Sequence, residues 1–543
     1  MGIPSGVARR RVVGPLALVG ALALAMAVLA PPAGPAGASA ARAHKTAGKP
    51  SRKHKAVAPV FNGPNGPEAR WVIAENKKPG TTAWLITGTQ TTTGIMGYAN
   101  MVQAQVGQRV TLFVSTEAPT YRVQAFRMGY YQGKGARLVW RSKTLSGNVQ
   151  PSCPVTPGIN MVQCSWSASL SFTITSTWVQ GEYLLKLIGS QGQQSYVPLT
   201  ISDPMSHAAY VIMDPVLTTQ VFNLFGGYDL YQGATPCAPD VYPCSSRSRV
   251  VSFDRPYGYG HGAGTYLTLV YPLTRLAEEE GLDVTYWTDI TLATGAAPLT
   301  DHKVLISAGH DEEWSLSMRN AAMTAADSGV NLIFFGASAI LRKVRLQASP
   351  LGANRQIVNY RDPQQDPLYG SDNADVSQNE WIQPPANWVP SELLGANYIG
   401  YDNGVVAPLV VADPSSWLFA GTGLGVRGAI PGVVSNDFQE YQPSAPDPSN
   451  VEILAHSPVQ VEFHGPAFAD TTYYTMPSSN AGVFDSGTTE WIPSLSLSAC
   501  QAGVSSCPAQ RMGELTANLL RVFGQGPVGL HHPSVANWQL FYG

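Results

Sequence analysis

The sequence predicts a mixed fold, in which an antiparallel β-sandwich is followed by an α/β domain with a parallel sheet. Short apolar or alternating segments, separated by Gly, Pro and Asn, run from about residue 82 to 203. From residue 204 strand-like segments alternate with helical ones, which is the pattern of βα units. Charged residues make up only 13% of the chain, while Gly (53) and Pro (42) are abundant, as in proteins with many turns and strands.

Residues 1–40 are predicted to be an export signal. Arg9, Arg10 and Arg11 precede an apolar run over residues 12–30, and residues 38–40 (Ala-Ser-Ala) provide a small-residue cleavage site. The apolar run is just long enough to span a bilayer, so a retained N-terminal anchor is the alternative. We therefore expect a secreted or cell-surface protein.

Residues 41–80 are predicted to be a disordered basic linker. Up to about residue 70 this segment is basic, rich in Ala and Pro, and without apolar periodicity. Its positive charge would suit association with anionic wall polymers or lipid head groups, whereas a merely soluble linker is the simpler interpretation. The net charge of the chain is −2, so the charge balance gives no reason to expect a nucleic-acid partner.

The six cysteines fall into three close pairs, which predicts three local disulfides in an oxidising compartment. Six cysteines allow 15 connectivities, of which three local loops is the simplest, and no CxxC spacing supports metal binding by the thiols. The pairs are Cys153 with Cys164, Cys237 with Cys244, and Cys500 with Cys507.

Six strands are expected in the sandwich domain, residues 81–203. Each segment alternates or is apolar, and turn residues separate the segments at regular spacing, which is typical of an antiparallel sandwich. The expected strands are residues 108–116, 120–128, 136–142, 171–175, 181–190 and 194–202.

The second domain, residues 204–543, is predicted to contain a parallel sheet with crossover helices. Beyond about residue 345 the pattern becomes irregular, and the last elements are expected to complete the same domain. Strands are expected at residues 208–215, 282–289, 302–309, 330–339, 340–347, 407–413 and 459–465, and helices at 265–281, 315–329 and 514–524.

The most informative segment is HKVLISAGHDEEWS, residues 302–315. An apolar strand ends in small residues and is followed by His310, Asp311, Glu312 and Glu313, just before a predicted helix. Ligands of open α/β sheets bind at the carboxyl ends of the strands, where acids can bind a cation or transfer protons. The structural alternative is that Asp311 caps the helix and the glutamates interact with its dipole, but four ionisable residues in succession favour a functional site.

Five motifs follow one another from about residue 90: IMGYANMVQAQVGQRVTLFVSTEAPTYRVQAFRMGYYQGKGARLV, SFDRPYGYGHGAG, VLISAGHDEEWS, GVNLIFFGASA and VRLQ. In this order they resemble the large subunit of N,N-dimethylformamidase, and more closely its secreted actinobacterial relatives of unknown substrate. The resemblance implies a β-sandwich and a three-layer α/β domain similar to class I glutamine amidotransferases, without their cysteine nucleophile. It also implies hydrolysis of a small amide at a mononuclear iron held by two Tyr and one Glu.

Carried over by position, the resemblance places the iron-binding glutamate at Glu312, two residues after His310. One tyrosine ligand falls at Phe222, in residues 220–223, where the phenol oxygen is lost. The other is expected at Tyr257 in the FDRPY motif, with Tyr231 as the nearby candidate.

Three further positions differ from the pattern that the resemblance implies. Glu313 stands where relatives commonly have Tyr, and Ser338 stands in place of a catalytic-site Asn. Asp437 stands in place of a catalytic acid and is one methylene shorter. These departures leave the expected fold intact and concern the chemistry alone.

An oxygen-rich site formed by Glu312, Tyr257 and Tyr231 would suit Fe(III), or Mg- or Ca-type ions, better than zinc. Such a metal would polarise a carbonyl group and lower the pKa of its bound water, while His310 or Asp437 transfers protons. The structural alternative for the tyrosines is that they cover apolar surface.

Ser338 permits a different hydrolase. It lies in residues 336–340 (Gly-Ala-Ser-Ala-Ile), which resemble the strand-to-helix nucleophile elbow of α/β hydrolases except that Ile340 replaces the second Gly. The base would be His310, His456 or His464, and a role as a helix cap or backbone-bonding residue is the simpler interpretation.

The leading hypothesis is therefore an exported hydrolase that cleaves an amide or related C–N bond of a small molecule at a metal-assisted site around Glu312. The alternatives are a non-catalytic wall-associated binding protein that retains the fold, and a serine hydrolase that uses Ser338. An oligomer is compatible with each of the three.

Overall fold

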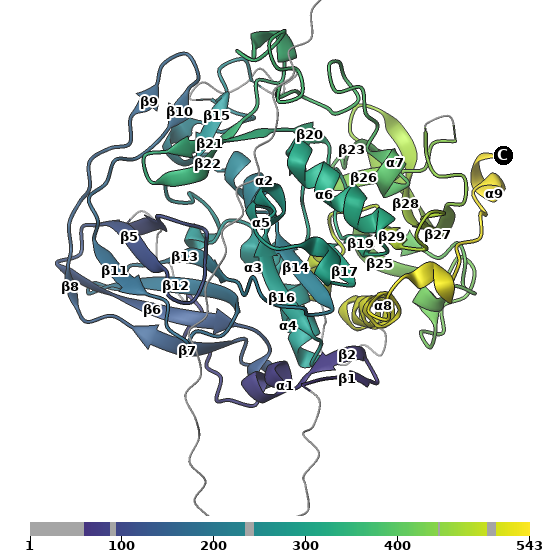
Figure 1. Cartoon of the computed structure of the whole chain (residues 1–543), viewed down its shortest axis with the longest axis horizontal. Helices are drawn as coiled ribbons and strands as arrows, with labels where there is room; N and C mark the ends of the chain where they lie inside the picture. Colours follow the sequence, from purple (N-terminus) through teal and green to yellow (C-terminus); the bar gives the residue numbers. More distant parts are fainter. Residues whose placement is uncertain (1–58, 87–93, 234–243, 444–445, 497–506) are drawn as a thin grey trace, which may run out of the picture. The chain divides into compact units, whose positions relative to one another are not determined.

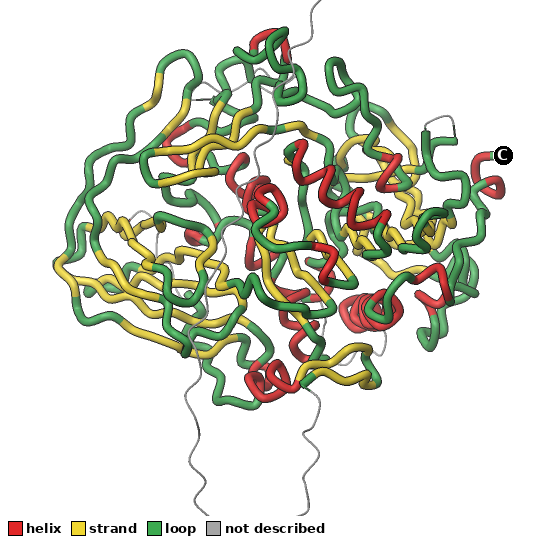
Figure 2. Tube along the Cα trace, viewed as in Figure 1, coloured by secondary structure: helices red, strands yellow, loops and turns green. Residues whose placement is uncertain are grey.

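Strands and loops make up most of the structure, and the helices are few and mostly short (Figure 2). The computed structural model describes residues 59–86, 94–233, 244–443, 446–496 and 507–543. The predicted export signal, residues 1–40, and two of the predicted disulfide cysteines, Cys237 and Cys500, lie outside these ranges. Within them, no helix combines the length and apolar character needed to cross a membrane.

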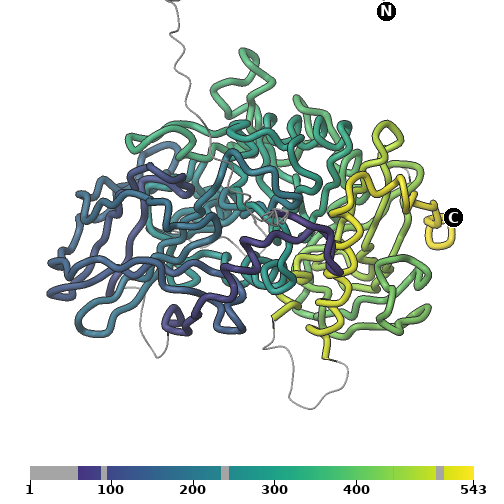
Figure 3. The backbone as a smooth tube through the Cα atoms, turned by 60° about the horizontal axis from the view of Figure 1, so that its bottom comes forward, coloured from purple at the N-terminus to yellow at the C-terminus, as the bar shows by residue number. Residues whose placement is uncertain are grey.

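An N-terminal hairpin and a short helix occupy part of the predicted linker. Strand β1 (Val60–Gly63) pairs with β2 (Gly66–Ala69), and helix α1 (Arg70–Asn76) follows directly. The prediction of disorder for residues 41–80 is therefore wrong over residues 60–76. Strand β2 is buried and lies beside helix α8 (Pro508–Phe523), as Figure 3 shows. This contact with a distant segment, which local periodicity does not reveal, stabilises the hairpin.

Two largely antiparallel sheets contain all six strands predicted for residues 81–203. One sheet has the order β11-β5-β3, and the other has the order β4-β13-β12-β6-β7 with β8 beside β6. Side chains such as Leu112, Val114, Val123 and Leu185 form one buried core between them. The bounds are β3 (Ile95–Ala99), β4 (Gln103–Ala104), β5 (Arg109–Thr116), β6 (Thr120–Met128), β7 (Ala136–Arg141), β8 (Leu145–Ser146), β11 (Leu170–Thr173), β12 (Gly181–Gly189) and β13 (Gln194–Ile201).

A seven-stranded mixed sheet follows, with the order β16-β14-β17-β19-β29-β28-β27. Its first five strands are parallel to one another, and β28 is antiparallel to both of its neighbours, β29 and β27. Strand β14 comes first in the chain but lies between β16 and β17, so the direction of winding changes there, which is where open α/β sheets bind ligands. The bounds are β14 (Tyr210–Asp214), β16 (Val284–Thr288), β17 (Val304–Ser307), β19 (Asn331–Phe334), β27 (Glu452–Val461), β28 (Gly465–Thr475) and β29 (Gly482–Asp485).

Helices cover both faces of this sheet, because successive side chains of a strand point to opposite faces. On β14, Tyr210 and Ile212 share a core with helices α4 and α8, whereas Val211 and Met213 share another with α5 and α6. Figure 1 shows α6 crossing the sheet close to β17 and β19. The bounds are α2 (Val216–Val221), α4 (Tyr271–Glu279), α5 (Asp289–Thr294) and α6 (Leu316–Asp327).

The helix predicted over residues 265–281 is interrupted. It consists of α3 (Tyr266–Leu269) and α4, which are separated at Val270, where φ is −126°. Pro272 lies in the first turn of α4, where its missing N–H is tolerated, but a proline in the middle of one continuous helix would remove a hydrogen bond. The proline therefore begins a new helix.

Short strand pairs and turns account for the irregular part of the chain. The segment 340–347, which was predicted as one strand, forms two strands, β20 and β21. The remaining elements are β9 (Val155–Thr156), β10 (Met161–Val162), β15 (Val250–Ser252), β18 (Glu313–Trp314), β20 (Arg342–Lys343), β21 (Arg345–Ser349), β22 (Gly352–Val358), α7 (Ser391–Leu394), β23 (Asn397–Tyr401), β24 (Ala407–Val410), β25 (Ala429–Val434), β26 (Asp437–Glu440) and α9 (Gln539–Tyr542).

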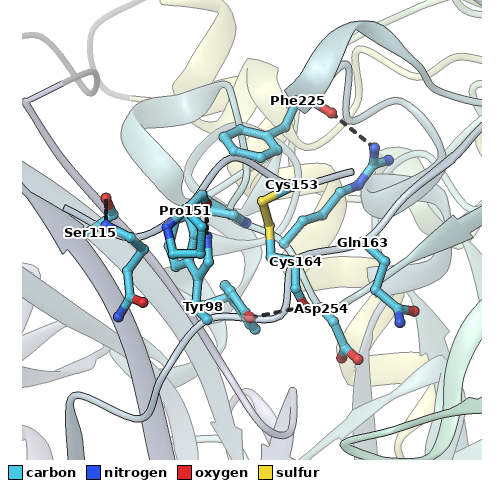
Figure 4. Close-up of a disulfide and its surroundings, with 12 residues drawn as sticks. Tyr98, Ser115, Pro151, Cys153, Gln163, Cys164, Phe225 and Asp254 are labelled. Atoms are coloured by element: carbon cyan, nitrogen blue, oxygen red, sulfur yellow. Dashed lines mark hydrogen bonds between the residues drawn. A yellow bond between two sulfur atoms is a disulfide. The ribbon is translucent and has the colours of Figure 1, made fainter. Parts of the chain in front are cut away.

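The predicted disulfide between Cys153 and Cys164 is present (Figure 4). Cys164 belongs to a small apolar cluster with Tyr98 of β3, and Phe225 packs against that cluster. The disulfide therefore supports the loop that follows α2. Cys244 and Cys507 are also disulfide-bonded.

A buried ion pair joins the first two sheets to the rest of the chain. Arg127 on β6 donates from Nη1 to Oε2 of Glu278 on α4 at 3.0 Å, and from Nη2 to Oε1 at 2.5 Å. Both side chains are completely buried. The Tyr286 hydroxyl of β16 donates to Glu278 Oε1 at 2.6 Å, so the pair is also hydrogen-bonded to the central sheet.

We expect Arg127→Met to lower the free energy of unfolding by about 3–5 kcal/mol, because it leaves the Glu278 carboxylate buried without its partner. Urea unfolding followed by tryptophan fluorescence measures this loss. The double variant Arg127→Met/Glu278→Leu should recover most of it, since no charge remains buried. A loss for Arg127→Met as small as that of an exposed ion pair, about 1 kcal/mol or less, would contradict the prediction.

Candidate functional site

The acids of residues 302–315 lie where β17 ends, beside the position at which the winding of the central sheet changes direction. Asp311, Glu312 and Glu313 are all buried. The ends of β17 and β19 approach closely here, because a Cβ atom on Gly336 would lie 1.8 Å from the Gly309 carbonyl oxygen. Glycine at position 336 thus permits the loops after the two strands to meet.

Asp311 does not cap helix α6, contrary to the structural alternative from the sequence. The helix begins after Ser315, whose Oγ accepts a hydrogen bond from the Met318 amide at 3.3 Å. Asp311 instead accepts a hydrogen bond from Ser307 Oγ at 2.6 Å. Glu313 lies in strand β18, which pairs with β20, and the first turn of α6 contains no acid. The acids therefore belong to a strand-end loop.

Glu312 is held by one cation and one phenol. Its Oε1 accepts from Arg342 Nε at 2.6 Å, and its Oε2 accepts from the Tyr231 hydroxyl at 2.5 Å. Burial alone would raise the Glu312 pKa, but the charge of Arg342, assisted by His310, holds it below its usual value. Burial, followed by the charge of Glu312, raises the pKa of Glu313 well above its usual range. The site thus pairs an ionised carboxylate with a protonated one.

An aromatic stack lies beside this pair of glutamates. The rings of Phe222 and Tyr231 are stacked with centroids 4.3 Å apart, and Phe222 lies 5.2 Å from the His310 ring. The Arg361 guanidinium lies 4.2 Å from the Tyr231 ring. The structure therefore brings Phe222, Tyr231, His310 and Glu312 together.

Tyr257 does not join this group. It lines a cavity with Asp214 and Arg255, and no hydrogen bond, ion pair or ring contact connects it to Glu312 within the described ranges. Helix α2 provides side chains to both places: Thr218 Oγ1 accepts from the Glu312 amide at 2.9 Å, whereas Val216 and Gln220 line the cavity. The structure therefore does not bring Tyr257 into contact with Glu312, and Tyr231 is the tyrosine bonded to that glutamate.

The residues around Glu312 do not fit an iron ion held by two tyrosines and one glutamate. Phe222 contributes no oxygen, and Arg342 Nε occupies the side of Glu312 Oε1 on which a cation would lie. The other carboxylate oxygen accepts the Tyr231 hydroxyl proton. Among the described residues, no group of three His, Cys, Asp or Glu side chains is arranged to hold a metal ion.

His310 lies between two carboxylates. Its Nε2 is 3.6 Å from Glu312 Oε2 and 3.5 Å from Asp437 Oδ2, and it makes no hydrogen bond within the described part of the chain. The side chains of His310 and Asp437 are 18% and 17% exposed, so both reach the surface, and Glu312 lies deeper at 5%. Burial raises the Asp437 pKa, although His310 opposes this. The Nε2 atom itself is buried, so other atoms of the His310 side chain provide its exposed part.

Ser338 lies next to this group but has no histidine partner. Its φ is +59°, and its Oγ donates to the Ala337 carbonyl at 2.6 Å and lies 3.4 Å from Asp437 Oδ2. No hydrogen bond joins it to His310, His456 or His464 in the part of the chain that the structure describes. No helix follows Ser338, since β20 begins at Arg342, so the helix-cap interpretation is wrong and Ser338 bonds to the backbone.

Sequence reasoning missed Arg342 and Tyr398. Arg342 lay within a predicted strand, and its pairing with Glu312 depends on the contact between β18 and β20. The Tyr398 hydroxyl donates to Asp437 Oδ1 at 3.3 Å across the pair of strands β23 and β26. Neither contact has a local signal in the sequence.

Buried acids also follow the two neighbouring strands. Burial, followed by the charge of Asp311, raises the pKa of Asp214 at the end of β14 to about 7. Burial raises the Asp311 pKa to about 6 and that of Asp289, after β16, well above its usual value. Three adjacent parallel strands therefore lead into carboxyl groups that hold protons at higher pH than exposed ones.

Residues 122–505 match the family described as N,N-dimethylformamidase beta subunit-like, C-terminal. This match spans more than half of the chain. The chain belongs to this family, as the motifs of the sequence predicted. The match begins within β6, so it includes part of the first two sheets.

Comparisons with solved structures add no argument. An uncharacterized protein from Bacillus anthracis str. Ames is 13% identical, with 19% of this chain and 80% of that chain covered and a TM-score of 0.13. A cycloisomaltooligosaccharide glucanotransferase from Paenibacillus sp. is 8% identical, with 50% of this chain and 34% of that chain covered and a TM-score of 0.14. No curated protein matches the chain.

We expect Asp214→Asn to reduce the dependence of stability on pH between about 4 and 7. The Asp214 pKa is about 7 in the folded chain, whereas an aspartate in an unfolded chain titrates near pH 3.9, roughly. The folded state holds the proton more tightly, so this carboxyl stabilises the fold at pH below its unfolded pKa, and the stabilisation is lost as pH rises through about 7. Urea unfolding at several pH values measures the effect. Asp203→Asn, at an exposed position, is the control, and an unchanged pH profile in Asp214→Asn would contradict the assignment.

We expect the wild-type chain to bind no stoichiometric Fe(III) through Tyr231 and Glu312. The variant Phe222→Tyr/Arg342→Met supplies a second phenol and removes the competing guanidinium, so it should gain a visible tyrosinate-to-iron absorption band when Fe(III) is added. Phe225→Tyr, which adds a phenol away from Glu312, is the matched control. A strong band in the wild type would contradict the prediction, because it would show that Fe(III) displaces Arg342 from Glu312.

Proposed function

We propose that the chain is an exported hydrolase that cleaves an amide or a related C–N bond of a small molecule. The observation that carries the proposal is the position of His310 Nε2 between the carboxylates of Glu312 and Asp437, at the carboxyl end of β17. Membership of the N,N-dimethylformamidase beta subunit-like family supports this reaction class. The predicted signal over residues 1–40 and the disulfide Cys153–Cys164 support export.

In the proposed reaction His310 is the group that transfers the proton. Water adds to the carbonyl carbon while the imidazole accepts one of its protons, and the same proton is then given to the leaving nitrogen as the C–N bond breaks. The products are a carboxylic acid and an amine. The Glu312 carboxylate, 3.6 Å from Nε2, stabilises the imidazolium that forms between these steps.

The neighbouring residues have positioning roles in this proposal. Arg342 and Tyr231 bind both oxygens of Glu312 and so fix the carboxylate that faces His310. Burial raises the Asp437 pKa, which favours the protonated carboxyl that can donate a hydrogen bond to the substrate carbonyl oxygen. No step passes through a metal ion, because the side chains around Glu312 do not fit the iron site.

A second candidate function is binding without catalysis. The replacement of a phenol by Phe222, and the Arg342–Glu312 pair, favour a site that retains the fold but has lost the chemistry of the family. In that case the basic segment before residue 59 would keep the protein at anionic wall polymers or lipid head groups. The partners in either case are a small molecule and the cell surface, and a homo-oligomer is compatible with both.

We expect His310→Gln to lower the kcat for hydrolysis of small amides by about 10²–10⁴-fold, the usual contribution of a group that transfers protons. Release of the amine from formamide, acetamide and N,N-dimethylformamide measures this rate. His464→Gln, which changes an exposed histidine, is the matched control and should keep full activity. Full activity of His310→Gln would remove His310 from the mechanism. If the wild type hydrolyses none of the three amides, the binding function replaces the catalytic one.

A further inference from the structure

A second polar site lies on the other side of helix α2 from Glu312. A cavity of about 30 Å³ lies between residues of β3 and β13 on one side and the chain around α2 and β15 on the other. Val197, Leu199, Val216 and Phe253 give it apolar walls. The free volume is that of one or two water molecules, since about 10–15 Å³ is enough for one.

The spacing of residues along α2 separates this cavity from the site around Glu312. Val216 and Gln220, four residues apart, line the cavity. Thr218 and Phe222, also four residues apart, contact Glu312 and Tyr231. Residues with this spacing share one face of a helix, so the two sites lie on different faces of α2.

Arg255 brings an unpaired positive charge to the cavity wall. The side chain is 2% exposed, and only Nη1 is hydrogen-bonded, to the Phe225 carbonyl at 3.0 Å and the Tyr228 carbonyl at 2.9 Å. The bond to Phe225 is drawn in Figure 4. Nε and Nη2 are buried without a hydrogen-bond partner, and Arg255 forms no ion pair with any described residue. An isolated buried charge is strongly unfavourable unless an opposite charge approaches it.

Other buried arginines of the chain have acid or carbonyl partners for their guanidinium groups. Arg355 Nε donates to Asp254 Oδ1 at 2.5 Å, and Arg127 is paired with Glu278. Arg247 has no acid, but its Nη1 and Nη2 donate to the carbonyls of Ser248, Asn359 and Tyr360. Arg255 is therefore unusual among them, because it lines a cavity while two of its nitrogens form no hydrogen bond with a described residue.

We propose that this cavity binds one small monovalent anion, a halide or a short carboxylate, beside the Arg255 guanidinium. The small free volume favours a small anion over a large one. The Tyr257 hydroxyl, which makes no hydrogen bond within the described residues, lines the same cavity and provides a second donor. Burial lowers the pKa of Arg255 to about 10, which still leaves the guanidinium charged at neutral pH.

Asp214 also lines the cavity but does not pair with Arg255. Its raised pKa, caused by burial and then by Asp311, leaves it partly protonated near neutral pH. It therefore opposes an anion less than an exposed aspartate would. Among the described residues, the acid whose charge raises the Arg255 pKa is Asp229, which forms no ion pair with it, so the bound anion supplies the direct partner.

The experiment compares thermal unfolding of the exported chain in chloride, formate and gluconate salts at equal ionic strength. Chloride or formate should raise the Tm by about 2 °C or more relative to gluconate, which is too large for the cavity. The salt that raises the Tm, chloride or formate, identifies the ligand as a halide or a carboxylate. The rise should disappear in Arg255→Met and persist in Arg247→Met, which changes a buried arginine that already has carbonyl partners.

Equal Tm values in the three salts, or an equal rise in Arg255→Met, would overturn the proposal. If Arg255→Met does not fold, crystals of the wild type grown in bromide provide the second measurement. An anomalous peak in the cavity beside the Arg255 guanidinium supports the site, and a map without a peak there, together with no effect of formate, rejects it. Neither measurement depends on hydrolytic activity, so the result is independent of the proposed hydrolase function.

Discussion

The bidentate pair between Arg127 and Glu278 is the interaction on which the arrangement of the other parts depends. Both ions are completely buried, so each is stable only while the other is present. Arg127 belongs to the antiparallel sheet and Glu278 to the helix that packs on the central sheet, which fixes the two sheets against each other. The cavity beside Arg255 lies between these sheets, and it retains its shape only if β13 and α2 keep this relation.

One short helix, α2, contributes to both the site around Glu312 and the cavity beside Arg255. Helix α2 follows β14 directly, at the position where the winding of the central sheet changes direction, and it has only six residues. One face receives the amides of Glu312 and Glu313 on Thr218 Oγ1, and the other closes the cavity with Val216 and Gln220. Because both faces are buried, neither site can shift without moving the other.

The sequence was sufficient for the elements whose pattern is local. The period-two segments of β5, β6 and β12 and the apolar segments of β14 and β17 appear where they were predicted. The hairpin at residues 60–69 was missed because its partner, α8, lies more than four hundred residues away. In the candidate site, the position of His310 and Glu312 at the end of β17 follows from the strand pattern. Arg342 lies beside Glu312 because β20 pairs with β18, and local sequence spacing does not predict this pairing. The sequence motif did not reveal that Tyr257 lines the cavity with Val216 and Gln220, because a motif does not determine on which side of α2 a side chain lies.

The resemblance to the family implies a metal ion at Glu312, whereas the structure places a guanidinium there. These two cations support different chemistry. A metal ion lowers the pKa of bound water and so creates the nucleophile, whereas a guanidinium keeps its protons and can only fix and neutralise a carboxylate. With Arg342 on Glu312 and Phe222 in place of a phenol, the deprotonation of water has no metal to promote it. That step then requires a base at the surface. His310 is the group beside Glu312 whose side chain is partly exposed, and its buried Nε2 lies near two carboxyl groups. In the proposed hydrolysis, the absence of the phenol is therefore compatible with catalysis, because the imidazole transfers the proton in place of a metal-bound water.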